Sequence, residues 1–205
     1  MSERFFISET DLRGLTADLL DGGTEVIAPV ATDICQSPSA VAATACTLDG
    51  SKVEIDYRQL TSADDLDLSR GLPQLSLKEF FLPEHEPLCR WRQKGTTVQV
   101  FEVPTEFAPR VVLAAKPCDA AALAVVDKVM NWDYEDELWN GRRAATTVIN
   151  LACQVIDDSC FCTAVGAAPD DVKGADGLLT PVEGGYVYEP ATDKGRALVE
   201  DFAAR

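Results

Sequence analysis

The sequence has few of the residues from which common catalytic centres are built. Among its 205 residues there is one histidine, His85, so a histidine-rich zinc or iron site is excluded and a Ser-His-Asp triad would have one candidate base. The G-x-G-x-x-G turn and the G-x-x-x-x-G-K-[ST] loop are both missing, and with them the usual signals for a dinucleotide or a nucleoside triphosphate. We interpret His85 as a surface loop residue and assign no catalytic residue.

Basic charge and long apolar runs are scarce as well. The net charge is −16, with 34 Asp and Glu against 18 Lys and Arg. This argues against nucleic acid as a partner, because phosphates call for a basic surface. No run of about 18 apolar residues occurs, and the residues after Met1 lack the basic-then-apolar layout of a secretory signal. We therefore expect a cytoplasmic protein that does not insert into membranes.

The apolar residues that are present predict an α/β fold. They make up 46% of the chain, enough to bury a sizeable core. We expect a mixed, largely parallel sheet with helices, plus a C-terminal β-hairpin and a short helix, in a single domain over residues 1–205 with 1–70 as a candidate N-terminal subdomain. The expected strands cover 5–8, 25–30, 96–103, 111–115 and 146–151, the helices 9–20, 120–130 and 194–204, and the hairpin 178–188, turning at Gly184-Gly185.

Two cysteines follow the strands predicted over 111–115 and 146–151. Cys118 comes after Lys116-Pro117, and Cys153 comes directly after the second run. The segment between them is long enough for a strand-helix-strand unit, in which both strands are parallel and their carboxyl ends share one edge of the sheet. The sequence therefore predicts that these two thiols lie close together.

Two further cysteines, Cys160 and Cys162, flank Phe161 shortly afterwards. In an extended segment, residues two apart point to the same side, so one site could use both thiols. Cys118 precedes Asp119, which we predict to be a helix N-cap, and the helix N-terminus would then lower the pKa of the Cys118 thiol. We predict that the four cysteines are ligands of one metal site.

The spacing C-x34-C-x6-C-x-C favours an iron-sulfur cluster, since structural zinc usually takes paired C-x2-4-C knuckles. Two alternatives remain open at this point: a zinc-stapled or metal-free assembly module, and a flavin-binding or thiol-redox domain with Cys118 as its reactive thiol. The chain has seven cysteines, an odd number, which argues against a disulfide framework. The remaining three, Cys35, Cys46 and Cys89, are interpreted as buried small hydrophobic residues, with Cys89 kept as an alternative ligand.

The arginine and aromatic residues between the predicted helix 120–130 and the predicted strand 146–151 have ordinary interpretations. We expect Arg142 and Arg143 to form ion pairs with the acidic residues between 133 and 137 rather than to contact a cluster. Three aromatic residues near the helix ends could cover the cluster or a partner surface, but aromatic residues in such places more often belong to the core, so their role is open at this point. They are Trp132, Tyr134 and Trp139.

Lys116-Pro117-Cys118-Asp119 and Cys160-Phe161-Cys162, with Arg142-Arg143 between them, are the most specific motifs of the chain. On these motifs the chain resembles the beta-type iron-sulfur subunits of sulfhydrogenases and anaerobic sulfite reductases, over roughly residues 70 to 200 with further matches at 75–83, 178–180 and 192–195. The resemblance implies a cytoplasmic electron-transfer subunit of an anaerobic redox complex. It also implies that Cys118, Cys153, Cys160 and Cys162 hold one 4Fe-4S cluster.

One feature departs from that family. Its members commonly continue into a ferredoxin-like segment with C-x2-C-x2-C-x3-C repeats, which this sequence lacks. We therefore expect a single cluster and no acid-base step from this chain. The remaining electron relay would come from another subunit, of a ferredoxin-like, flavin, or hydrogenase or reductase type.

Overall fold

A computed structural model describes residues 3–33, 53–68, 73–103, 106–156, 158 and 160–203. Cys35 and Cys46 lie outside the described residues. Within the described residues, nine strands form a seven-stranded sheet and a separate two-stranded one. The strands are β1 (Phe5–Ser8), β2 (Glu25–Asp33), β3 (Val53–Gln59), β4 (Cys89–Lys94), β5 (Thr97–Glu102), β6 (Arg110–Ala115), β7 (Thr146–Leu151), β8 (Gly177–Val182) and β9 (Gly185–Pro190).

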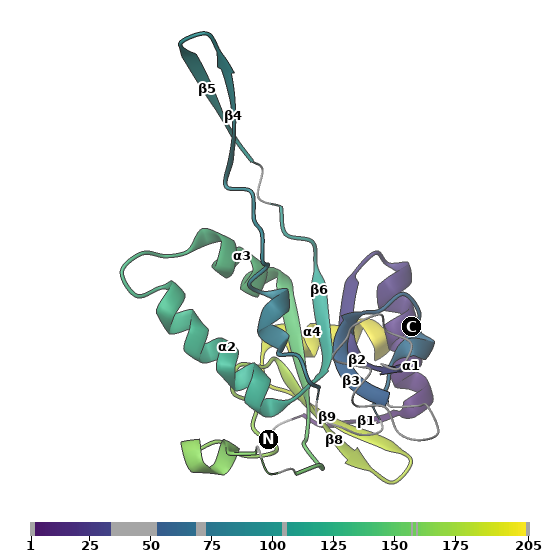
Figure 1. The fold of residues 1–205 in the computed structure, drawn as a ribbon. Coiled ribbons are helices and arrows are strands. Elements are labelled where there is room, and N and C mark those ends of the chain that lie inside the picture. Colours follow the sequence, from purple (N-terminus) through teal and green to yellow (C-terminus); the bar gives the residue numbers. More distant parts are fainter. Residues whose placement is uncertain are drawn as a thin grey trace.

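The large sheet has a parallel centre and antiparallel edges (Figure 1). Its strand order is β1-β9-β8-β7-β6-β2-β3. Neighbours from β2 through β6 and β7 to β8 run parallel, whereas β3 on one side and β9 and β1 on the other are antiparallel. The prediction of a mixed, largely parallel α/β sheet is confirmed.

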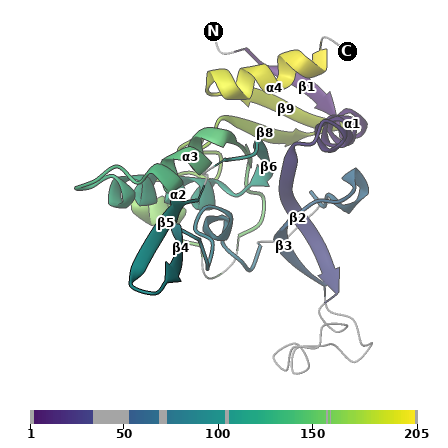
Figure 2. The ribbon, with the colours of Figure 1, turned by 90° about the horizontal axis from the view of Figure 1, so that it is seen from above.

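Helices cover both faces of this sheet, as the view from above shows (Figure 2). The α-helices of the described chain are α1 (Glu9–Asp21), α2 (Pro117–Met130), α3 (Glu137–Ala145) and α4 (Asp193–Ala203), and the 3-10 helices are η3 (Ala63–Asp65), η4 (Leu77–Phe80) and η5 (Cys162–Val165). Parallel strands are buried on both faces by such layers, which explains the continuous apolar run 111–115.

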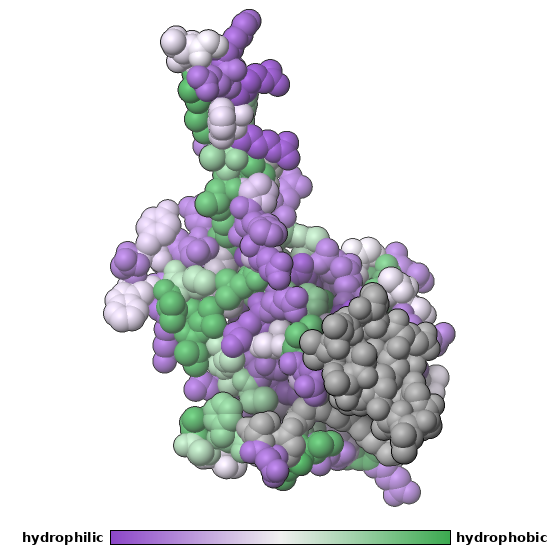
Figure 3. Space-filling view, in the orientation of Figure 1, coloured by the Kyte–Doolittle hydropathy of each residue, from purple (hydrophilic) through white to green (hydrophobic). Residues whose placement is uncertain are grey.

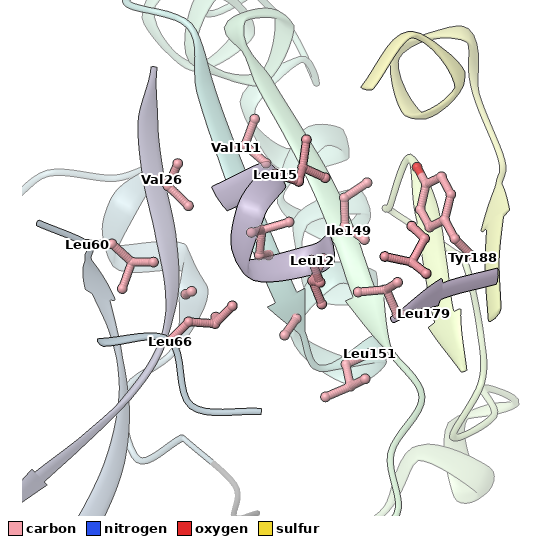
Figure 4. Packing of buried hydrophobic residues seen from close by; sticks show 14 of the residues in the cluster. Leu12, Leu15, Val26, Leu60, Leu66, Val111, Ile149, Leu151, Leu179 and Tyr188 are labelled. Carbon is pink, nitrogen blue, oxygen red and sulfur yellow. The ribbon is translucent and has the colours of Figure 1, made fainter. Parts of the chain in front are cut away.

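Two cores result from this layering. On the first face, Leu12 and Leu15 of α1 pack with Val26, Val111 and Ile149 of three parallel strands (Figure 4). On the other face, the core is formed by residues of α2, α3, η4 and the strands. Its largest members are Tyr57, Leu77, Phe81, Leu123 and Trp139. The sheet between these two cores fixes the strand ends that carry Cys118 and Cys153.

Most expected elements begin and end as the sequence indicates. Ser8 caps α1, its Oγ accepting a hydrogen bond from Asp11 N at 3.1 Å, and Gly22 ends that helix. The strand expected to stop near Pro29 instead continues to Asp33. The strand can continue because β2 pairs with β6 only as far as Ile27. Beside Pro29, β6 therefore has no residue that needs a hydrogen bond from the N–H group that proline lacks.

The C-terminal hairpin and short helix are confirmed, with one correction at the turn. Val182 pairs with Gly185, so the two turn residues are Glu183 and Gly184 rather than Gly184 and Gly185. Gly184 has φ +82°, a backbone conformation that glycine adopts without strain. Strand β9 then pairs with β1, which places the N-terminal strand at the edge of the sheet.

Strands β4 and β5 form a hairpin that projects away from the rest of the molecule (Figure 1). We call residues 88–103 the arm. Every residue of its two strands is exposed. The strand expected over 96–103 is confirmed as β5, while its partner β4 was not predicted.

Candidate functional site

The carboxyl ends of β6 and β7 bring two of the four predicted ligands together. The two strands are parallel, with Ala115 beside Asn150. Cys118 follows β6 by three residues and Cys153 follows β7 by two. The charge of Cys153 contributes to the pKa of Cys118, which places the two thiols within electrostatic range of each other.

The other two thiols lie in the loop over residues 152–169 that follows β7. Two hydrogen bonds anchor its start: Ala152 N donates to Leu179 O and Cys153 N donates to Pro169 O, both at 2.8 Å. The second bond also ties the beginning of the loop to its end. Both Cys160 and Cys162 are therefore carried on a segment whose ends are fixed beside Cys153.

The local backbone at these thiols differs from the expected extended segment. Cys162 is half-buried and begins η5, and Phe161 before it has φ −136° and ψ 12°. Cys160 is exposed. Within the described ranges, no three or more Cys, His, Asp or Glu residues are grouped closely enough to hold a metal ion. Cys118 and Cys153 are thus the neighbouring pair, with Cys160 and Cys162 nearby in sequence.

Helix α2 begins at this site, three residues earlier than an Asp119 cap would allow. Its N-cap is Lys116 and its first residue is Pro117, a position where proline fits because its missing N–H would have no helical partner. The prediction that Asp119 is the N-cap is wrong. Asp119 instead accepts a hydrogen bond from Ser76 Oγ at 3.1 Å and another from the Tyr57 hydroxyl.

Tyr57 connects this carboxylate to the end of β6. Its buried hydroxyl accepts a hydrogen bond from Lys116 N at 2.8 Å. Burial is the main cause that raises the pKa of Asp119, and the bonds from Ser76 and Tyr57 act in the opposite direction. Residues far apart in the sequence therefore hold the turn before Cys118 in place.

Cys118 is an exposed residue, but partial burial raises the pKa of its thiol, and the nearby Asp119 carboxylate raises it further. The N–H groups of Cys118 and Asp119 donate toward the sulfur and act in the opposite direction. The expectation of a lowered pKa is wrong, because burial and a neighbouring negative charge outweigh the helix terminus. A raised pKa leaves less thiolate for nucleophilic attack, which disfavours a thiol-redox role for Cys118.

The last residues of β6 are irregular. Ala114 is fully buried with φ +56°, a conformation that costs a non-glycine residue roughly 1–2 kcal/mol. The pairing register with β7 also shifts between Val112 and Ala115. Irregularities of this kind redirect a strand and gather at functional sites, and this one lies immediately before the turn to Cys118.

An unpartnered acceptor lies on β7 three residues before Cys153. Asn150 is fully buried, and its Nδ2 donates to Asp171 O at 2.8 Å. Its Oδ1 has no hydrogen-bond partner within the described part of the chain. Buried acceptors are normally satisfied by protein, water or a bound group, so this end of β7 has hydrogen-bonding capacity that the described residues do not use.

The loop before β8 packs against the first turns of α2 at Gly174. A Cβ at Gly174 would lie 2.0 Å from Ala120 O, and the residue has φ +81°. Only glycine fits this contact. The close approach holds the loop that carries Asp171 against the start of α2.

The remaining site predictions have mixed outcomes. Cys89 is exposed, so its interpretation as a buried residue is wrong. His85 is an exposed loop residue, as expected, and it lines a hollow of about 310 Å³ with Arg110 and Thr146. Those two residues begin β6 and β7, so this hollow lies at the opposite end of the strands from Cys118 and Cys153.

Arg142 and Arg143 form ion pairs, as expected, but with other partners. Arg142 pairs with Glu86 and donates to Phe81 O at 2.8 Å. Arg143 lies 3.5 Å from Asp127. The acidic residues between 133 and 137 are therefore not their partners.

The aromatic residues near the helix ends separate into two groups. Trp139 is buried, and its Nε1 donates to Asp127 Oδ1 at 2.7 Å, as a core residue should. Trp132 and Tyr134 are 83% and 73% exposed. These two residues do not belong to the core.

Comparison with known proteins finds a distant relative. The chain is similar to Sulfhydrogenase 2 subunit beta of Pyrococcus furiosus. The two are 23% identical over 143 residues, which cover 70% of this chain and 41% of the relative, and we interpret this as a distant relationship. The chain therefore spans less than half the length of that relative.

No family model matches the chain, and no solved structure matches it. None of the described helices combines the length and apolar character needed to cross a membrane.

Proposed function

We propose that this chain is an electron-transfer subunit of a cytoplasmic anaerobic redox complex and that it holds one 4Fe-4S cluster through Cys118, Cys153, Cys160 and Cys162. The observation that carries the proposal is the proximity of Cys118 and Cys153 at the ends of two adjacent parallel strands. The similarity to a sulfhydrogenase beta subunit supports the same class of protein.

The donor set suits this cofactor. All five described cysteines are thiols rather than disulfides, and thiolates are the usual ligands of such clusters. In the proposal, Cys118 and Cys153 are the ligands held by the sheet, and Cys160 and Cys162 complete the set from the loop over residues 152–169. Because metal binding is coupled to folding, loading of the cluster would stabilise the fold.

Once bound, the cluster would supply reversible one-electron transfer. The residues of the chain would set how readily it accepts an electron through burial, charge and hydrogen bonds to sulfur. The N–H groups of Cys118 and Asp119 already donate toward one sulfur. The Asp119 carboxylate places a negative charge beside the site, which disfavours the reduced, more negative state.

Electron transfer through one cluster needs a donor and an acceptor. The relative is named as one subunit of a larger protein, which supports the proposal that a different subunit takes up or delivers the electrons here. A ferredoxin-like, flavin, or hydrogenase or reductase subunit would serve.

The decisive test is the iron and acid-labile sulfide content after purification without oxygen. We expect about four of each per chain and a broad absorption that weakens on reduction. Cys160→Ser should lose most of the iron, because it removes one proposed ligand. Cys89→Ser is the matched control, since Cys89 is an exposed thiol at the start of the arm, and it should keep the wild-type iron content.

Other outcomes would contradict the proposal. Zinc, or no metal at all, in the wild-type protein would instead support the assembly-module alternative. A yellow protein with a stoichiometric flavin and no iron would support the flavin alternative. Loss of iron in Cys89→Ser together with retention in Cys160→Ser would overturn the ligand assignment.

A further inference from the structure

The arm is an exposed hairpin without any covering element from the described part of its own chain (Figures 1 and 3). Trp91, Val98, Val100 and Phe101 are large apolar residues of the arm that are 47–67% exposed. A two-stranded hairpin alone is marginally stable in water, and three strands or a packed face are normally needed. Both faces of the arm are therefore open to a further protein contact.

The strand register separates the arm into an apolar face and a basic face. Trp91 pairs with Val100, and Gln93 pairs with Val98. Because successive residues of a strand point to opposite faces, these four side chains share the apolar face. Their neighbours along the strands share the other. The basic face comprises Arg90, Arg92, Lys94, Thr97, Gln99 and Phe101.

The charge of the arm is opposite to that of the whole chain. Residues 88–103 contain Arg90, Arg92 and Lys94 but only one carboxylate, Glu102, which gives a net charge of +2 in a chain whose net charge is −16. Considering the described residues alone, none of the three cations forms an ion pair. Another copy of this acidic chain is consequently a surface of complementary charge.

The complementary feature on the body is the turn between α2 and α3. We call residues 131–136 the acidic loop. Asp133 and Glu135 are exposed there, next to the exposed rings of Trp132 and Tyr134. These two carboxylates form no ion pair with any other described residue. An aromatic ring beside a carboxylate is a favourable contact for an arginine, which can bond to one and stack on the other.

We propose that the basic face of the arm docks on the acidic loop of a second copy of the chain, and that the two copies exchange this contact in a two-fold dimer. The arm leaves the body before β6 begins, and α2 returns from the far end of β6 to the acidic loop, so both features lie on the same side of the molecule (Figure 1). Two copies with antiparallel arms therefore present each arm to the loop of the other. The contact is independent of the four proposed cluster ligands, which follow the carboxyl ends of β6 and β7.

Contact through the face of the hairpin fits the chemistry of the arm better than contact through its edges. Closely spaced Arg and Lys side chains discourage edge-to-edge pairing of strands. The same cations favour a carboxylate-bearing surface. The dimer should accordingly weaken as salt concentration rises, because exposed charge pairs are screened.

The test is sedimentation of the full chain over a wide range of protein concentration. We expect a reversible dimer in the wild type. Arg90→Glu combined with Arg92→Glu should weaken self-association by about tenfold or more, since like charges would then face the acidic loop. The matched control is Arg4→Glu combined with Arg58→Glu, which makes the same charge change at exposed positions on the body and should leave the dimer unchanged.

A mixing experiment identifies the docking site. Asp133→Arg combined with Glu135→Arg should also weaken the dimer. When that variant is mixed with the arm-reversed variant, the reversed arm faces the reversed loop and the unchanged arm faces the unchanged acidic loop. Both contacts of the heterodimer then join opposite charges, so association should return. Circular dichroism of each variant checks that the fold is intact.

Three results would overturn the proposal. These are a wild type that stays monomeric at every concentration, a dimer that the arm reversal leaves unchanged, and a mixture that fails to associate although both variants are folded. An arm that binds a different protein while the chain itself stays monomeric would also overturn it. Iron content is measured on the same samples, so failure of the dimer is distinguishable from failure of the cluster proposal.

Discussion

Valine occurs in the middle of a strand both at the centre of the sheet and on the arm, but it is buried in the sheet and exposed on the arm. Val112 of β6 is fully buried, whereas Val100 of β5 is 67% exposed. In the sheet, parallel neighbours and the helices on one face cover the side chain, and on the arm nothing from the described part of the chain does. Apolar residues in a strand thus predict a strand, but they do not predict whether its own domain or a partner covers it.

The comparison is tested most strongly by truncating a tryptophan in each region. Trp139→Ala should lower the free energy of unfolding by about 3–5 kcal/mol, because it removes a buried ring that packs 5.9 Å from the ring of Phe81. Trp91→Ala, on the arm, should change it by no more than about 0.5 kcal/mol. Urea unfolding at low protein concentration, where the proposed dimer dissociates, measures both. Equal losses at the two sites would mean that the arm packs against its own body.

A glycine in each region provides a sharper test, because both glycines have positive φ but different surroundings. Gly174→Ala should cost about 2–4 kcal/mol, from the left-handed backbone together with the clash on Ala120 O. Gly95→Ala, in the turn of the arm, meets no atom within 4 Å and should cost about 1 kcal/mol from the backbone alone. Thermal unfolding of the two variants gives the difference. A Gly95 variant as unstable as the Gly174 variant would contradict the open surroundings of the arm.

The smallest effect is expected from removing one hydroxyl in each of two environments. Tyr57→Phe leaves the buried Lys116 N–H without its acceptor and should cost about 1–3 kcal/mol. Tyr134→Phe, in the exposed acidic loop, should stay within about 0.5 kcal/mol of wild type. Hydrogen exchange at the Lys116 amide reports the same bond directly. If the Lys116 amide exchanges as slowly in Tyr57→Phe as in the wild type, its hydrogen bond to the Tyr57 hydroxyl does not stabilise this turn.

Local patterns in the sequence were sufficient for most strands and helices of the sheet, but strand β3 and helix α3 were not predicted. The run 111–115 identifies its strand because the cause is short-range. Strand β4 escaped prediction since Arg90, Arg92 and Lys94 alternate with other residues in a pattern that resembles a charged loop. Its strand character becomes evident only through pairing with β5.

At the candidate site, the topology was predictable and the electrostatics were not. The placement of Cys118 and Cys153 at neighbouring strand ends follows from the strand-helix-strand pattern. The raised pKa of Cys118 depends on burial and on Asp119, and the partners of Asp119, Ser76 and Tyr57, come from distant parts of the chain. No sequence spacing signals contacts of that kind.

The pairing of β1 with β9 has a consequence for biosynthesis. Phe5 lies beside Tyr188 in the finished sheet, so β1 is synthesised long before the strand that becomes its neighbour. Until then, the core around Ile7, Leu12 and Leu15 is incomplete, since contacts this distant in sequence form late. A chaperone that shields β1 and α1 would therefore be of most use to this protein while it is still being synthesised.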